Sequence, residues 1–421
     1  MPSLFLYSAG SNARGQLATG DQEDAHHFTP SRFSNVTTPG RLPDGAVGLR
    51  QVACGANHTL ALLEMQDGVL ELWGCGDGRR GQLGPSYDSN LANTTFRPLD
   101  LLLGGDTEGY AVRIIAAGWE TSYVVLSRAE ADDVVLSMGA DDRGALGVGG
   151  TDATSSTPSA PRTHTVPLRP LLSDLGHEDA TLQVLALSAG PHHVIAHVRA
   201  LRPDGSAFAF LAGWGAARHG QLGPLDAPAP FLARPTLVSM PTTHALAALA
   251  LGQAHSAFLR EDGTLGAMGA TRKNQYAGLA GREHVAAVAC TWHGTYALFR
   301  SGVVVAAGSG AHGQLGRGRE GVERSAGPAP VQFPFAMEPG RAARIACGSE
   351  HALCLVDQGE RGGMEVWGWG WNEHGNLGLG STEDVHEPTR VWPPAEEGAR
   401  RRGEAINIWA GCGTSWVLVL R

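Results

Sequence analysis

Residues 73–84 read WGCGDGRRGQLG, in which an apolar strand end runs into a glycine-rich loop, and this pattern returns along the whole chain. Seven copies align on the first glycine of Gly-Gln-Leu-Gly. The aligned positions are Gly15, Gly81, Gly144, Gly220, Asn274, Gly313 and Gly375. Self-similarity of this kind indicates a repeat architecture, in which each copy is one structural unit with loops of variable length.

A second element alternates with the first. It consists of an apolar strand, Ala-Gly or Cys-Gly, two variable residues, His or Thr, and a further apolar strand. Its seven copies begin at Gln51, Ile114, Ala186, Leu249, Val288, Arg344 and Asn407. Short runs of Val, Ile, Leu and Ala between glycines are typical of strands. Turn sequences such as Asp67-Gly68 and Asp204-Gly205 indicate tight hairpins between the second and third strands of a repeat.

Each repeat is therefore predicted to be a four-stranded antiparallel sheet, and seven of them form an all-β, seven-bladed β-propeller. Pro30, Pro98 and Pro388 follow the Gly-Gln-Leu-Gly loops and fit an outer edge strand, because proline cannot donate to a ladder. The shortest gap between copies, from Asn274 to Gly313, predicts a trimmed fifth blade.

The two ends of the chain predict how the ring closes. Residues 4–8 read as a third strand, and residues 407–420 read as a first and second strand. The terminal strands are expected to share one blade, which leaves no open sheet edge. Residues 1–421 are accordingly expected to form a single domain.

The bulk composition restricts the classes of function. The net charge is −9 and the pI is about 6.0, whereas general nucleic-acid binders usually carry a basic excess, so direct nucleic-acid binding is not expected. The six cysteines form no CxxC pair and suit reduced thiols. No apolar run approaches the length of a membrane span. These features predict a cytoplasmic protein, with the nucleus as an alternative, and no membrane contact.

The alternating Gly-Gln-Leu-Gly and Ala-Gly-x-x-His elements resemble the regulator-of-chromosome-condensation repeats over essentially the whole chain. The resemblance implies a seven-bladed propeller. It also implies two known roles, nucleotide exchange on a small GTPase and chromatin binding, although the basic N-terminal tail used for chromatin is missing. The opening SAGSNARGQLATGDQED is similar to that of the fungal α-tubulin suppressor type. That type pairs with a small acidic zinc/iron protein in diphthamide synthesis and Elongator-dependent tRNA wobble-uridine modification.

The sequence contains no Gly-x-Ser-x-Gly, phosphate-loop or HExxH motif, so no enzyme chemistry and no cofactor are predicted. The first hypothesis is a non-enzymatic adaptor that docks a protein partner, with the small acidic metal-binding protein as the candidate. The alternatives are a guanine-nucleotide exchange factor for a small GTPase, and a chromatin or ubiquitin-pathway scaffold.

Strand direction places both repeated loops on one face of the disc, called the motif face below, and the Asp-Gly turns on the other. The two variable residues after Ala-Gly or Cys-Gly, together with the residue at the His/Thr position that follows them, are called the tip of a blade. Candidate partner-binding tip residues are Asn57, Trp119, Glu120, His192, Gln253, Trp292, His293 and Glu350. Tryptophan at a turn tip is unusual and is enriched at binding hot spots. Trp119 and Trp292 either contact a partner or fold over the central channel as a plug.

Two further rings of side chains are expected on this face. A basic or imidazole residue precedes each aligned glycine: Arg14, Arg80, Arg143, His219, Lys273, His312 and His374. The first three are candidates to attract an acidic partner; alternatively their stems pack locally and their heads are solvated. Four tips end in histidine: His58, His193, His255 and His351. These histidines are expected to bond local backbone, with a metal site as the weaker alternative.

Overall fold

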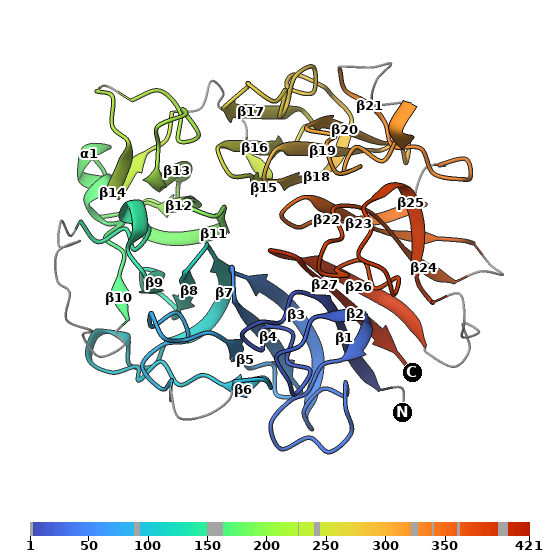
Figure 1. Ribbon diagram of the computed structural model, residues 1–421. Helices are drawn as coiled ribbons and strands as arrows, with labels where there is room; N and C mark the ends of the chain where they lie inside the picture. The colour runs from blue at the N-terminus through green and yellow to red at the C-terminus, as the bar shows by residue number, and fades with distance from the viewer. Residues whose placement is uncertain are drawn as a thin grey trace.

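The computed structural model describes residues 3–87, 93–149, 163–225, 227–239, 245–320, 327–338, 341–359, 363–394 and 403–421. Their strands form seven antiparallel sheets that stand radially around a central axis (Figure 1). The predicted seven-bladed β-propeller is therefore confirmed. No helix in these ranges has both the length and the apolar character needed to cross a membrane.

The blades are numbered in chain order from the N-terminus, and their strands are given from the axis outward. Blade 1 contains β26 (Glu404–Ala410), β27 (Thr414–Leu420), β1 (Leu4–Gly10) and β2 (Ala25–Pro30). Blade 2 contains β3 (Ala46–Cys54), β4 (His58–Met65), β5 (Leu70–Gly76) and β6 (Arg97–Pro98). Blade 3 contains β7 (Ala111–Ala117), β8 (Thr121–Ser127), β9 (Val134–Gly139) and β10 (His164–Thr165).

The remaining blades follow the same order. Blade 4 contains β11 (Thr181–Ala189), β12 (His193–Leu201), β13 (Ala207–Ala216) and β14 (Phe231–Leu237). Blade 5 contains β15 (Leu246–Leu251), β16 (His255–Arg260) and β17 (Leu265–Gly269). Blade 6 contains β18 (Val285–Thr291), β19 (Gly294–Phe299), β20 (Val304–Gly308) and β21 (Ala329–Pro330). Blade 7 contains β22 (Ala342–Cys347), β23 (His351–Asp357), β24 (Met364–Gly370) and β25 (Val385–Trp392).

The short helices η1 (Gly105–Thr107), η2 (Asp142–Gly144) and α1 (Pro170–Asp174) lie in connections between strands. The fourth strands β2, β6 and β25 contain the three prolines expected at the outer edge. Blade 5 has three strands in the described part of the chain, as its short repeat predicts.

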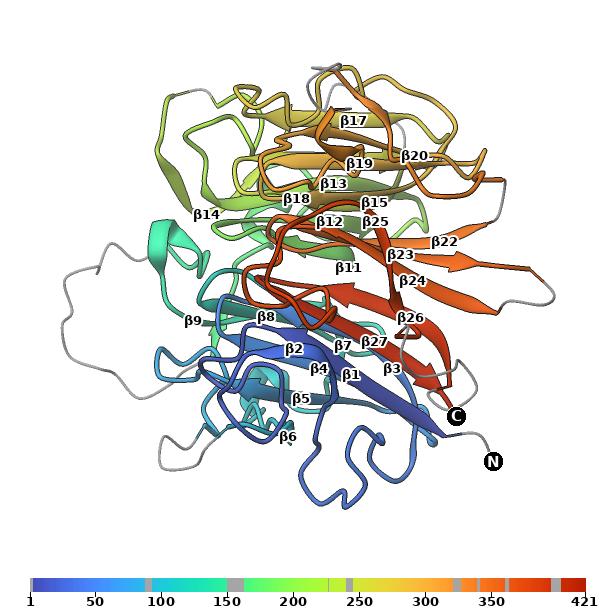
Figure 2. The same cartoon turned by 45° about the vertical axis from the view of Figure 1, so that its right-hand side comes forward.

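The ring is closed by strands from both ends of the chain. β1 pairs antiparallel with β27 in an unbroken register from Leu4 opposite Leu420 to Gly10 opposite Thr414. The two termini consequently lie side by side (Figures 1 and 2). The shared blade predicted from the sequence is confirmed, and it removes the free edges that an open ring would expose.

The hydrophobic core lies between neighbouring blades. Trp214 of β13 is fully buried against blade 3, and its indole N–H donates to the carbonyl of Ala145 at 3.0 Å. Trp369 of β24 repeats this contact with the carbonyl of Gln314 in blade 6 at 2.9 Å. Burying such a side chain contributes about 2–3 kcal/mol. Each indole also rests on the last glycine of the preceding loop, which explains why that position of the motif is glycine.

Strand one of each blade carries a β-bulge near its first residues, at the end of the strand that lies away from the motif face. The bulged residues are Val47, Arg113, Leu185, Ala247, Ala286, Ala343 and Ile406. A bulge leaves one residue unpaired and increases the local twist. Val47, Leu185 and Ile406 are exposed for this reason although they lie in strands.

Candidate partner-binding face

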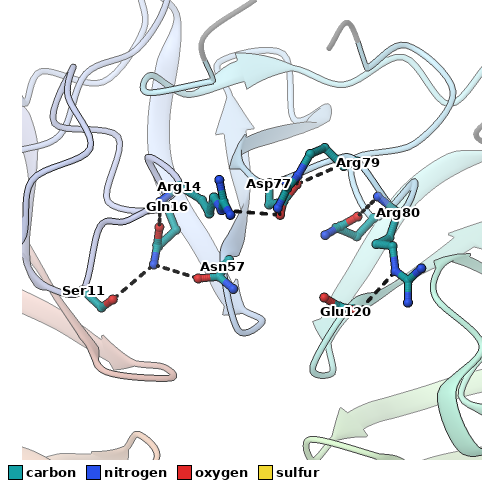
Figure 3. Close-up of polar contacts among 9 residues, drawn as sticks. Ser11, Arg14, Gln16, Asn57, Asp77, Arg79, Arg80 and Glu120 are labelled. Atoms are coloured by element: carbon teal, nitrogen blue, oxygen red, sulfur yellow. Dashed lines mark hydrogen bonds and ion pairs between the residues drawn. The ribbon is translucent and has the colours of Figure 1, made fainter.

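The two repeated loops meet on one face because the tip of each blade reaches the Gly-Gln-Leu-Gly loop of the preceding blade. The side-chain amide of Gln16 in blade 1 lies 3.5 Å from Asn57 Oδ1 at the tip of blade 2. Gln314 in blade 6 donates to Glu350 Oε2 at the tip of blade 7 at 2.8 Å. Figure 3 shows this arrangement around blades 1 to 3. The predicted proximity of the two elements is therefore observed.

The tip backbones also bond to one another around the axis. The amide of Ala56 donates to the carbonyl of Trp119 at 2.8 Å, and the amide of Trp119 donates to Pro191 at 2.8 Å. Beyond blade 5, the amide of Trp292 donates to Ser349 at 2.7 Å, and that of Ser349 donates to Gly411 at 3.1 Å. These bonds satisfy backbone groups that a turn would otherwise expose to water. The tips thus form two bonded series, one through blades 2 to 4 and one from blade 5 through blade 7 to blade 1, and together they are called the collar around the channel.

Trp119 and Trp292 come from blades 3 and 6 and meet over the channel. Their ring centroids lie 5.8 Å apart at an interplanar angle of 50°, and Trp119 also contacts the ring of His192 at 6.1 Å. The same two indoles and the strand-one ends of all seven blades line a cavity of about 120 Å³. This is the arrangement expected of a plug. Both indoles remain only half-buried, so each still presents surface on the motif face.

The four tip histidines bond between blades, and the prediction that they bond local backbone is wrong. The pairs are His58 Nε2 with Ser122 Oγ (2.9 Å), His193 Nε2 with Ser256 Oγ (3.0 Å), His255 Nε2 with Thr295 Oγ1 (3.1 Å) and His351 Nε2 with Ser415 Oγ (3.0 Å). Each hydroxyl lies in strand two of the following blade. The correction has a physical reason: the local amides are already engaged within and between the tips.

These histidines are neutral. Burial lowers the pKa of His58, His255 and His351 to about 4 and that of His193 to about 3. The Ser256 hydroxyl donates to the carbonyl of Gln221 at 2.7 Å, so His193 Nε2 is the donor to Ser256. No group of three or more potential metal ligands occurs among the described residues. The hydrogen bonds of these histidines join neighbouring blades.

The basic ring is largely paired with carboxylates of the next blade. Arg14 lies 4.0 Å from Asp77, and Arg80 lies 3.4 Å from Glu120 (Figure 3). His312 contacts Asp384 at 2.9 Å, and His374 contacts Asp24 at 2.7 Å. Arg14 and Arg80 remain 47% and 60% exposed in these pairs, so their heads are largely solvated, and attraction of an acidic partner by this ring stays a prediction. Arg143 is exposed and has no carboxylate partner in the described chain, so it remains the candidate that fits the original hypothesis.

The remaining predicted tip residues are half-buried around the same collar. His293 Nδ1 contacts Glu350 Oε1, so Glu350 links the tip of blade 6 to the loop of Gln314. His192 stands beside Trp119, and burial together with the charge of Arg143 lowers its pKa. The backbone amide of Gln253 donates to the carbonyl of Trp292 at 3.0 Å.

Some residues of this face were missed by the sequence analysis. Asp77 forms ion pairs with both Arg79, at 2.7 Å, and Arg14, at 4.0 Å. Burial raises the pKa of Asp77, but the hydrogen bonds and charge of Arg79, with the charge of Arg14, lower it further than burial raises it. Asp24 and Asp384 were also missed. The repeated Glu-Asp at 23–24 and 383–384, each at the same distance after the glycine loop, was the available signal.

The comparisons with known proteins agree with this geometry. Two models of the regulator of chromosome condensation (RCC1) repeat match the chain, one at residues 5–62, 301–355 and 365–418 and the other at 49–82 and 342–376. The "Secretion-regulating guanine nucleotide exchange factor" of Bos taurus is 28% identical over 98% of this chain and 82% of its own length. An RCC1 repeat-containing protein of Schizosaccharomyces pombe is 27% identical over 99% of both chains.

A solved structure shows the same fold. Prp20p from Saccharomyces cerevisiae, described with its binding properties to Gsp1p and histones, superposes with a TM-score of 0.70 at 17% identity, covering 99% of this chain and 91% of its own. The repeats, the ring and the full-length relatives lead to one conclusion: this chain is a seven-bladed propeller that carries regulator of chromosome condensation (RCC1) repeats.

Proposed function

We propose that this protein is a guanine-nucleotide exchange factor for a small GTPase, which docks on the motif face. The observation that carries the proposal is the bovine relative, whose name states this activity and whose alignment runs through the whole propeller of this chain. The exchange-factor hypothesis, an alternative in the sequence analysis, thus has more support than the adaptor hypothesis. The relatives named above do not bear on a small acidic metal-binding partner, diphthamide or tRNA modification, so that hypothesis stays an untested prediction.

Exchange needs binding energy and no covalent step. A protein that binds the nucleotide-free GTPase more tightly than the nucleotide-bound form lowers the nucleotide affinity by the same factor, because the two equilibria are linked. The collar of tips supports such a role. Its backbone is held by bonds between blades, so little ordering cost remains to be met when a partner binds.

The half-buried indoles of Trp119 and Trp292 supply the aromatic surface that binding hot spots favour. Glu120 and Arg80 stand close by as a charged pair that a partner can approach or separate. Together these side chains place an aromatic centre inside a charged rim, which is the usual composition of a protein interface.

A nucleotide-release assay tests the proposal. Small GTPases covering each subfamily of the source organism are loaded with fluorescent GDP, and release into excess GTP is followed with and without the protein. The expected result is acceleration of at least one GTPase by about tenfold or more, together with a complex that dissociates when GDP is added. Failure to accelerate any of them overturns the proposal. Asp67→Asn with Asp204→Asn, on the opposite face, is the matched control and should accelerate release like the wild type.

A further inference from the structure

A second concave feature lies on the motif face at the junction of blades 6 and 7. It is a cleft of about 630 Å³ between the loop after β20 and the loop after β24. Its lining includes Trp371, Glu373, Glu383, Asp384 and His312. None of the proposals above uses it, and it is separate from the channel cavity under Trp119 and Trp292.

Hydrogen bonds hold the loops that line the cleft in place. Asp384 Oδ1 accepts from the backbone amide of Asn372 at 3.1 Å, and its Oδ2 contacts His312 Nδ1 at 2.9 Å. One carboxylate therefore ties the loops of two blades together. The buried Asn372 side chain also donates to the carbonyls of Ser381 and Glu383, at 2.9 and 3.1 Å, and fixes the loop that carries the glutamate.

Two carboxylates in the cleft are available for a ligand. Glu373 and Glu383 are exposed, and within the described chain neither side chain has a hydrogen bond or ion pair. The lining contains one permanent cation, Arg319, against three carboxylates. The cleft is therefore electrically complementary to a positive group, in contrast to the arginine-bearing loops of blades 1 to 3.

Trp371 adds an aromatic wall and connects the cleft to the tip collar. Its indole meets the ring of His374 edge-on, with centroids 5.4 Å apart, and leaves part of its surface exposed. Its backbone amide donates to the carbonyl of Glu350, a tip residue, at 2.9 Å. Tryptophan is the best side chain for a cation–π contact, and planar guanidinium stacks on it more often than ammonium does.

We infer that this cleft receives an arginine side chain of the protein that docks on the motif face. The guanidinium stacks on Trp371 while Glu373 and Glu383 accept its N–H donors. The cleft would thus be a second contact beside the tip collar, and the inference rests on the proposal that a protein docks on this face, although not on the exchange activity.

Fluorescence anisotropy with a labelled, end-capped tetra-arginine peptide tests the inference at low ionic strength, where surface charges are least screened. Saturable binding is expected for the full-length protein, with weaker binding of tetra-lysine. Glu373→Gln with Glu383→Gln should weaken tetra-arginine binding about tenfold, and Trp371→Leu about fivefold. The matched control is Glu23→Gln with Glu283→Gln, which removes two exposed charges elsewhere and should change binding about twofold or less.

Absence of saturable binding, or an equal loss in the control, overturns the inference. The outcome is separable from that of the exchange assay. Peptide binding with no accelerated GTPase refutes the proposed function alone. Full exchange by the Glu373→Gln, Glu383→Gln variant, with no peptide binding by the wild type, refutes the cleft alone.

Discussion

The tips of blades 2, 4, 5 and 7 differ from those of blades 3 and 6. The first four end in a histidine that is buried and bonded to the next blade. The other two carry Trp119 and Trp292, followed by Thr121 and Gly294, and their indoles remain partly open on the motif face. One repeated loop thus has two forms: histidine tips bond neighbouring blades together, and tryptophan tips, which leave part of the indole exposed, are proposed to contact a partner.

The following blades match this division. After each histidine tip, strand two of the next blade supplies a serine or threonine hydroxyl. After the tryptophan tips, the same position is Val194 or Ala352. A hydroxyl buried without a partner costs about 1–3 kcal/mol, which accounts for Val194 and Ala352 at these two junctions. At the junction of blades 1 and 2 the tip ends in Thr414, and the hydroxyl of Thr59 is present because it donates to the carbonyl of Gln16 at 2.9 Å.

The largest expected effect is the pH dependence of stability that the histidine tips create. In the unfolded chain a histidine titrates near its ordinary pKa of 6.5, whereas burial lowers the folded pKa to about 3–4. The unfolded state therefore binds more protons below pH 6.5. The free energy of unfolding is therefore undiminished by these histidines above pH 6.5. Between pH 6.5 and 4 it falls by about 1.4 kcal/mol per pH unit for each histidine.

Urea unfolding followed by tryptophan fluorescence between pH 8 and 4.5 measures this loss. The double variant His351→Thr, Ser415→Ala should reduce the proton uptake on unfolding by about one, because one of the four groups is gone. An unchanged slope in that variant would show that the histidine is not the titrating group.

The next largest effect comes from removing one hydrogen bond between blades, that of His351 with Ser415. His351→Thr alone leaves Ser415 Oγ without its partner and opens space, so unfolding should become easier by about 2–3 kcal/mol. Ser415→Ala alone should cost about 1–2 kcal/mol. The double variant should recover part of the sum, since it copies the apolar junctions at blades 3 and 6. Strict additivity in this double-mutant cycle would exclude the coupling.

In contrast to the histidine tips, the tryptophan tips should affect partner binding more than stability. Trp119→Ala with Trp292→Ala removes the aromatic contact over the channel, for which about 1 kcal/mol of stability is expected to be lost. Partner binding should weaken by about 2 kcal/mol or more, roughly 30-fold. Binding in a nucleotide-free pull-down and unfolding in urea are both required. Intact binding with reduced stability would make these residues a plug alone.

The smallest expected effect concerns the rim. Arg80 and Glu120 are both partly exposed, so exchanging them as Arg80→Glu, Glu120→Arg should change the free energy of unfolding by less than about 1 kcal/mol. The single variant Arg80→Glu places two carboxylates together and should reduce the rate of partner association in a salt-dependent manner. A loss of several kcal/mol in stability would mean that this pair is structural.

The fold was accessible from the sequence because each strand end is marked by glycines and the order of the two repeated elements leaves one topology. The same pattern located the tips. It could not identify the partners of His193 or Arg80, because those contacts join residues 63 and 40 positions apart across a blade junction. The pattern also missed the bulges at Val47 and Leu185, because no particular residue type marks a bulged position.

Hydrogen–deuterium exchange of the complex with the GTPase found in the release assay tests the central claim, that the motif face is the docking face and the tryptophan tips lie within it. Amides at residues 117–121 and 291–294 should exchange more slowly in the complex, whereas those of the turns at 67–68 and 204–205 should not change. Protection confined to those turns, with unchanged tips, would place the partner on the opposite face and contradict the account.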